Sequence, residues 1–514
     1  MTSQQKDTLF ILVKSLSKSE KRQFKLYVNR LGVNADAKFL ALFNLLDKMH
    51  DYKEAEILKS GIVKKQQLSN LKAHLYKQIL VSLRLNPVNQ NIRLQIREQL
   101  DFATILYHKG LYKQSLKILD KAKSVAIENQ EKVVAYEIVE LEKVIETQYI
   151  TRSISGRADE LAIQAKELSM QNVLTSKLSN LSLQLYGIML KFGYVKSDEE
   201  YIWVTEYYEA HLPKFKFSDL DFREKLWLYK AQLWYSFLIQ DFLSCYKYSL
   251  KWVELFYENE QMIYLNPVFF LKGNNYLFES MFYVKNRTGF EEALKKMEDT
   301  IANEKFPKND NLDVLIFLYT YNSKLNLHFL DGTFEDAFPL ENEILDGIKE
   351  YNDKIDEHHI MVFYYKLACM HFGAGDNKKC ISYLKKIINN KNLTMREDLM
   401  CFARVLSLVA HYEAGMDYHL EVQLKSTYKF LLKMDDLHEV QKEMIKFLRN
   451  LGEIYPHELK DEFKKLHKTL KKYEDHPYEK RAFLYLDIIS WLESNIENRP
   501  VGQIIREKAK SLIR

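Results

Sequence analysis

The chain has 514 residues, of which 47% are hydrophobic and 28% are charged. This length exceeds a single compact core, and the apolar content excludes an intrinsically disordered protein. The 15 glycines and 8 prolines are too few for the turns of a β-rich protein, so the composition predicts an all-α fold. The net charge of +5 is small for the whole chain but unevenly distributed along it.

Residues 1–91 are predicted to form a basic N-terminal helical module. Ser17 and Glu20 have the spacing of a capping box, in which each side chain accepts a hydrogen bond from the other residue's backbone N–H. A helix is therefore expected to begin there. The apolar spacing at 39–46 and at 68–83 predicts two more helices, with a short one between them.

The N-terminal module carries an excess of positive charge. Residues 1–100 hold 18 Lys and Arg against 8 Asp and Glu, and no acidic residue occurs between Ile57 and Arg97. The excess indicates an anionic partner, although a basic face that is solvated, or docked on acidic parts of the same protein, is the simpler interpretation. The anion-binding candidates are Lys64, Lys65, Lys72, Lys77 and Arg84.

The turn around Gly61 has the outline of a DNA-reading helix-turn-helix, because a short helix precedes it and a basic helix follows. Leu68 and Leu71, however, have the spacing of buried residues in the second helix. No cluster of Arg, Asn or Gln stands where base edges would be read. Nucleic acid is therefore a less favoured partner than protein.

From residue 92 onwards a short turn recurs between amphipathic stretches of helical period. It places Gly or Asp at a break, usually an aromatic residue shortly after it, and a small residue three positions later. In the later part of the chain these breaks fall at residues 241, 289, 332, 375 and 415, about 40 to 50 residues apart. Such a period predicts stacked helical hairpins, which is the organisation of an α-solenoid.

The clearest unit spans residues 100–126. Ala103 precedes the break at Gly110, and Tyr112, Ser115 and Ala122 follow it. This pattern resembles the tetratricopeptide repeat, in which small residues let two helices approach closely and the aromatic residue fills the gap at the turn. Later units match the family less well, and residues 130–230 carry helices without a clean signature.

The resemblance implies a right-handed α-solenoid of tetratricopeptide-like hairpins over residues 92–455. Such solenoids bind extended peptides in the concave groove that the first helix of each hairpin lines. Carrying the groove positions of the family onto matching residues gives these candidates: Tyr107, Lys230, Trp234, Phe282, Lys285, Asn322, Asn326, Tyr365 and Phe372. Amides bind a peptide backbone and aromatic rings take side chains, although core packing is the alternative for the aromatic candidates.

No motif of known chemistry occurs in the chain. It has no phosphate-binding glycine loop, no nucleophile elbow and no paired-histidine zinc motif, so we expect no catalytic residues, no cofactor and no metal site. Four cysteines without a C-x-x-C pair indicate small core residues in a reducing compartment. His328, His371 and His411 recur in one register, which we interpret as packed, hydrogen-bonded histidines rather than a metal site or a pH-sensitive seam.

Residues 456–514 are again helical in pattern and are predicted to cap the C-terminal end of the solenoid. We find no secretory signal and no apolar run of the roughly 18 residues that a membrane span needs, so we expect a cytoplasmic protein. Homo-oligomerisation cannot be predicted from these patterns.

Together these patterns predict a non-catalytic scaffold that binds protein or peptide in the groove of a helical-repeat solenoid. The alternative is a regulator whose basic N-terminal module binds nucleic acid while the solenoid senses a peptide or protein. The segment from Leu12 to Arg22, followed by a helical array, resembles uncharacterised bacterial helical-repeat proteins. That resemblance implies the fold and supplies no activity.

Overall fold

The computed structural model describes residues 7–512 apart from 31–36, 87–90, 149–155, 352–353, 391–396, 434–438, 451–454, 456, 480–482 and 484–486. These described residues form α-helices and short 3-10 helices and contain no β-strand. The predicted all-α class is therefore confirmed. The chain divides into two compact units, which we call unit 1 (Met1–Ala165) and unit 2 (Lys166–Arg514). The predicted division at residues 91 and 455 stays a prediction.

Unit 1 contains eight complete helices among its described residues and the start of a ninth. They are α1 (Thr8–Ser15), α2 (Lys18–Arg30), α3 (Ala37–Lys48), α4 (Glu54–Lys59), α5 (Lys65–Arg84), α6 (Ile92–His108), α7 (Tyr112–Glu128), α8 (Lys132–Gln148) and α9 (Arg157–Phe192), which continues into unit 2.

Helices α1 to α5 enclose one hydrophobic core, with the rings of Phe24, Phe39 and Phe43 fully buried in it. The predicted capping box begins α2: the Ser17 backbone N–H donates to Glu20 Oε2 (2.8 Å) and the Glu20 N–H donates to Ser17 Oγ (3.2 Å). A local sequence signal therefore fixes the start of this helix.

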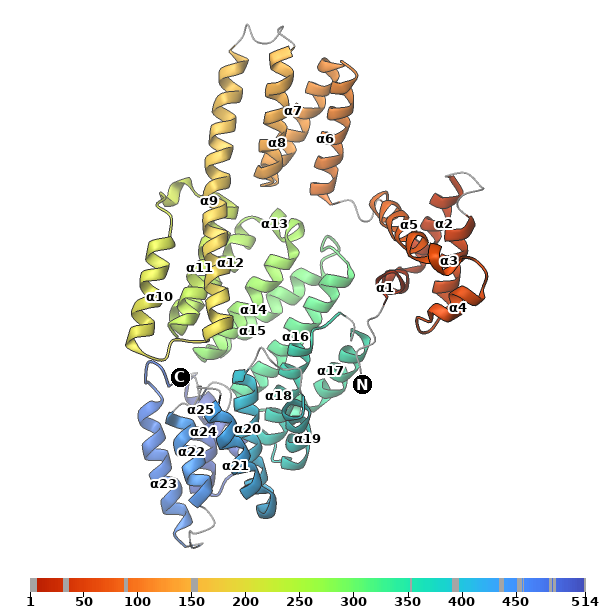
Figure 1. The fold of residues 1–514 in the computed structure, drawn as a ribbon. Coiled ribbons are helices and arrows are strands. Elements are labelled where there is room, and N and C mark those ends of the chain that lie inside the picture. Colours follow the sequence, from red (N-terminus) through yellow and green to blue (C-terminus); the bar gives the residue numbers. More distant parts are fainter. Residues whose placement is uncertain are drawn as a thin grey trace. The chain divides into compact units, whose positions relative to one another are not determined.

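Unit 2 continues with helices that follow one another along the chain (Figure 1). They are α10 (Asp198–His211), η3 (Phe217–Asp219), α11 (Phe222–Leu238), α12 (Phe242–Glu258), α13 (Glu260–Leu265), α14 (Pro267–Tyr283), α15 (Arg287–Ala302), α16 (Asp310–Asp331), η4 (Glu335–Ala337), α17 (Phe338–Glu350), α18 (Glu357–Gly373), α19 (Asn377–Ile388), α20 (Glu397–Glu413), α21 (Asp417–Lys433), α22 (Glu439–Asn450), α23 (Leu459–Leu470), η6 (Lys471–Tyr473), α24 (Ile488–Glu497) and α25 (Val501–Leu512).

Helices end at or beside four of the five later predicted breaks and at Gly110, because the backbone turns there through a left-handed residue. The break expected at Gly289 is displaced to Lys285, since Gly289 lies inside α15. Gly110, Gly332, Gly375 and Gly415 have positive φ values, and Gln240 and Lys285 take this role at the other two breaks. Glycine adopts this conformation without the steric cost that a Cβ imposes. The recurring turn that the sequence indicates is thus where the helices stop.

Contacts within unit 2 recur at a nearly constant separation in the sequence. The rings of Trp227 and Phe269 meet, and so do those of Trp234 and Tyr276, each pair about 42 residues apart. Arg287 bonds Asp331 across 44 residues. Helices also pack against the next helix but one, as α14 does on α16 and α16 on α18. This arrangement is compatible with a helical-repeat fold.

The C-terminal helix returns to the middle of unit 2, which the sequence does not indicate. Helix α25 packs against α16, and Arg506 Nε donates to the carbonyl oxygen of Gly332 (2.9 Å). A Cβ at Gly332 would lie 2.8 Å from the carbonyl oxygen of Gly502. Gly332 therefore serves both the left-handed turn and the close approach of α25.

Candidate functional site: half-buried cations on α11, α14 and α18

Three of the predicted peptide-contacting side chains lie in the core of unit 2. Trp234, Tyr365 and Phe372 are only 7%, 4% and 6% exposed. The Trp234 ring packs 4.8 Å from Tyr186 and 5.5 Å from Tyr276, measured between ring centroids. These rings hold helices together, and any contact of theirs with a peptide stays a prediction.

The candidates Tyr107, Phe282 and Lys285 belong to other parts of the fold. Tyr107 of α6 is half-buried in unit 1, with its ring 6.0 Å from that of Tyr112. Phe282 is half-buried near the end of α14 in unit 2. Lys285 is exposed at the left-handed turn between α14 and α15.

The two asparagine candidates are brought together by a lysine that we did not predict. Lys366 of α18 donates from Nζ to Asn326 Oδ1 (2.9 Å) and to the main-chain oxygen of Asn322 (3.2 Å), both on α16. Asn322 Nδ2 donates to the carbonyl oxygen of Leu318 (2.8 Å), while Asn322 Oδ1 is buried and accepts no hydrogen bond from the described residues. The amides are thus oriented, and one acceptor remains unsatisfied.

Lys366 is strongly desolvated although water still reaches part of its side chain. Burial lowers the pKa of Lys366 to about 8, and the Glu279 carboxylate on α14 opposes this shift. Glu279 also accepts a hydrogen bond from the Tyr283 hydroxyl (2.5 Å). Because Glu279 acts on Lys366 through its field and not through a direct ion pair, the cation is only partly compensated.

Lys230 and Lys272 form a second cationic group, on α11 and α14. The Lys230 ammonium lies 4.7 Å from the centre of the Trp227 ring and 5.8 Å from that of Phe269. Burial, and then the like charge of Lys272, lower the pKa of Lys230 to about 8. Both lysines are half-buried, and neither forms an ion pair with any residue that the structure describes.

One face of α14 connects the two cationic groups. Lys272, Tyr276 and Glu279 are spaced by four and three residues, so they lie along the same side of that helix. Burial, reinforced by Glu279 and Tyr319, raises the pKa of Tyr276, which keeps its hydroxyl neutral. We call the connected set Lys230, Lys272, Tyr276, Glu279, Asn322, Asn326 and Lys366 the polar stripe.

The polar stripe has the chemistry of a binding surface. The Cys369 thiol, three residues after Lys366 on α18, has its pKa raised by burial to about 12, so it remains a protonated and poor nucleophile at neutral pH. Within the described ranges no cluster of His, Cys, Asp and Glu could hold a metal ion. The polar stripe offers three ammonium groups, two amides, the neutral Tyr276 hydroxyl and the Glu279 carboxylate.

The three histidines in one register make separate hydrogen bonds. His371 Nε2 lies 3.0 Å from Glu341 Oε2, and His411 Nδ1 lies 2.6 Å from the carbonyl oxygen of Ser407. His328 Nδ1 lies 2.8 Å from Thr333 Oγ1. Each imidazole therefore has a hydrogen-bond partner of its own, and none of these partners is another of the three histidines.

The predicted anion-binding residues of α5 divide into two kinds. Lys64, Lys65 and Lys77 are exposed, whereas Lys72 is half-buried and donates to both Asp7 and the Tyr52 hydroxyl. Arg84 is exposed but lies 3.2 Å from Asp101. Two of the five cations thus already have an acidic partner in unit 1, Asp7 for Lys72 and Asp101 for Arg84, in line with the simpler interpretation of the basic face.

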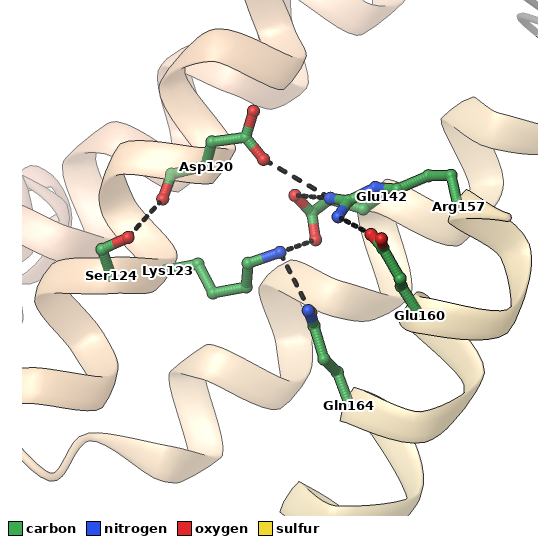
Figure 2. Close-up of polar contacts among 7 residues, drawn as sticks. All are labelled: Asp120, Lys123, Ser124, Glu142, Arg157, Glu160 and Gln164. Carbon is green, nitrogen blue, oxygen red and sulfur yellow. Dashed lines mark hydrogen bonds and ion pairs between the residues drawn. The ribbon is translucent and has the colours of Figure 1, made fainter. Parts of the chain in front are cut away.

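Unit 1 contains a buried ionic network that the sequence analysis missed (Figure 2). Glu142 of α8 is fully buried and lies 2.6 Å from Lys123 Nζ of α7 and 3.2 Å from Arg157 Nη2 of α9. Lys123 also donates to Gln164 Oε1 (3.2 Å), and Arg157 pairs with Glu160 (3.1 Å). Burial raises the pKa of Glu142 despite the two cations, which act to lower it.

Comparison with protein-family models, curated proteins and solved structures finds no match for this chain. No helix in the part of the chain that the structure describes is long and apolar enough to cross a membrane. The site is therefore interpreted from its own geometry.

A sequence signal for the missed lysines exists. Lys366 and Lys272 each stand in a helix whose central residues are otherwise largely apolar, Met361–Cys369 and Phe269–Leu277 respectively. A lone lysine in such a helix is either at an edge or held in a half-buried place. The family register pointed to Tyr365, one residue before Lys366, and so selected a core side chain.

Proposed function

We propose that the protein is a non-catalytic scaffold that binds an extended peptide or protein segment along the polar stripe of unit 2. The observation that carries this proposal is the gathering of half-buried, incompletely paired polar groups on α11, α14, α16 and α18. Buried charges and amides in stable cores are normally satisfied by partners. A ligand with acidic groups and backbone amides would satisfy these.

We further propose that the packed helices form a right-handed, tetratricopeptide-like α-solenoid. The constant separation of contacts and the left-handed residue at each break support this assignment. In such an array, helices α11, α14, α16 and α18 would be the first helices of successive hairpins, which is where that repeat family presents its groove.

The test is selection of a random peptide display library on the full-length protein, followed by titration calorimetry of the enriched peptides. Hydrogen exchange should show protection in α11, α14, α16 and α18 when a peptide is bound. Lys366→Met should weaken binding, whereas the exposed Lys295→Met on α15 should not. Recovery of no peptide, or protection confined to other helices, would contradict the proposal.

A second candidate function is nucleic-acid binding by unit 1, as in a regulator. Lys64 and Lys65 are exposed at the N-terminal end of α5, where the helix dipole disfavours cations, so they do not serve helix stability. We would measure DNA and RNA binding by the full chain and by the triple variant Lys64→Met/Lys65→Met/Lys77→Met. Binding that weakens with salt and is lost in the variant would support this function, and no binding at low salt would refute it.

A further inference from the structure

The pair Lys230 and Lys272 is the part of the polar stripe that the protein itself leaves uncompensated. Two ring contacts bracket the pair: Trp227 on Phe269 on one side, and Trp234 on Tyr276 on the other. On α11 and on α14 alike, ring, lysine and ring are spaced by three and four residues. The two lysines therefore occupy equivalent places on neighbouring helices.

These lysines lie close enough that, after burial, the charge of Lys272 lowers the pKa of Lys230 further. A lysine at a surface normally extends its ammonium into water, but that of Lys230 lies against the rings of Trp227 and Phe269. Cation–ring attraction offsets part of the desolvation and cannot offset repulsion from a second cation. An anion between the two would relieve both costs.

Two other half-buried lysines have polar or acidic partners that compensate their charge. Lys366 has two hydrogen bonds to α16 and the field of Glu279, and Lys72 in unit 1 bonds Asp7 directly. No acidic residue among those described plays this part for Lys230 and Lys272. The contrast identifies the missing group as one that a ligand brings.

We infer that Lys230 and Lys272 together bind an anionic side chain of the peptide, with the Trp227 and Phe269 rings contacting an apolar residue beside it. This inference rests on the proposed function and specifies its ligand. The anionic group is an oxyanion, supplied either by the carboxylate of Asp or Glu or by a phosphorylated Ser or Thr. Either accepts charge-assisted hydrogen bonds from two ammonium groups.

The experiment uses two display libraries on the full-length protein. One library carries unmodified random peptides, and the other is the same library phosphorylated by a promiscuous serine/threonine kinase. Each is selected on the wild type, on Lys230→Met, on Lys272→Met and on Lys295→Met. Methionine keeps the length and apolar stem of lysine, and Lys230→Arg serves as the charge-preserving variant.

We expect acidic residues to be enriched from the first library, or phosphorylated residues from the second, and the library that yields them identifies the source. Each Lys→Met change in the pair should weaken the enriched peptide by about tenfold or more, which is the effect of losing one charge-assisted hydrogen bond. Lys295→Met and Lys230→Arg should retain both the affinity and the preference.

The outcomes separate the two proposals. Peptides that bind the wild type without enrichment of acidic or phosphorylated residues, or that bind Lys230→Met and Lys272→Met equally well, would overturn the inference and leave the scaffold function standing. Failure to recover any peptide from either library would overturn both.

Discussion

Unit 1 and unit 2 each bury charged side chains, but they differ in whether those charges have oppositely charged partners. In unit 1, Glu142 is enclosed by Lys123 and Arg157, and those cations have further partners (Figure 2). In unit 2, burial and then the charge of Lys272 lower the pKa of Lys230, and neither lysine pairs with a carboxylate among the described residues. We call the first set closed, because its charges are compensated within the fold, and the second set open, because it has no compensating carboxylate among the described residues.

We propose that the difference separates charges that stabilise the fold from charges that bind a ligand. A closed network recovers its desolvation cost within the folded chain, and removing one member exposes that cost. A pair of like charges without a carboxylate lowers the stability of the free protein, which agrees with the proposed role of this pair in binding. Each prediction below tests one side of this comparison.

The largest effect is expected from Glu142→Ala. The change leaves Lys123 and Arg157 buried without their shared carboxylate, and it should lower the free energy of unfolding by about 3–5 kcal/mol. Guanidinium unfolding, with hydrogen exchange of α7 and α8 as a local readout, measures it. Glu140→Ala is the matched control on the same helix, because the Glu140–Lys143 pair is partly open to water and should contribute less than about 1 kcal/mol. Equal effects of the two changes would show that the network is not closed.

The opposite sign is expected for Lys272→Met. Removing one of two mutually repelling cations while keeping its apolar stem should raise the free energy of unfolding of the ligand-free protein by about 0.5–2 kcal/mol. Lys295→Met on α15 is the control and should change stability by less than about 0.5 kcal/mol. A loss of stability in Lys272→Met would mean that the lysine has a structural role, and the contrast between the two units would fail.

The pH dependence of stability offers a third test. Lys230 and Lys366 have pKa values near 8 in the folded protein, against 10.5 as the ordinary value. Between pH 8 and 10 the unfolded chain therefore binds more protons than the folded one, and stability from these groups rises with pH. Below pH 8 both lysines are protonated in the folded and in the unfolded chain, so the folded protein bears the full cost of burying their charged ammonium groups.

This contribution is isolated by comparing the wild type with Lys230→Met/Lys366→Met. From pH 8 to pH 10 the wild type should gain stability relative to the double variant, with a slope below the limit of about 1.4 kcal/mol per pH unit for each lysine, because both side chains are half-buried. The comparison cancels the opposing effects of the thiols and tyrosines. Parallel stability curves for the two proteins would refute the assigned pKa shifts.

Local signals predicted the helices well, and long-range contacts were beyond them. The capping box at Ser17 and the glycine at 332 each act within a few residues, so the sequence shows them directly. That α25 packs on α16 depends on residues far apart in the chain, and no local pattern marks it.

The candidate site was predicted in part. Asn322, Asn326 and Lys230 belong to the polar stripe, but the register carried over from the repeat family selected the core ring of Tyr365 in place of Lys366. One residue along a helix turns a side chain by about 100°, so a small error of register exchanges core for surface. Whether a lysine has an acidic partner likewise depends on tertiary contacts, as Lys72 and Asp7 show.

The smallest expected effect concerns Glu279. This carboxylate compensates Lys366 in part and lies on the same helix as the uncompensated Lys272. Its field raises the pKa of Lys366 against the effect of burial. Glu279→Gln keeps an acceptor for the Tyr283 hydroxyl and removes the charge, so the pKa of Lys366 should fall further below its ordinary value. The pH dependence of amine acylation at Lys366, followed by mass spectrometry, measures this shift, with Lys295 as the internal standard. An unchanged pH dependence would mean that Asn322 and Asn326 alone compensate the Lys366 ammonium. Neither cationic group of the polar stripe would then have a compensating carboxylate.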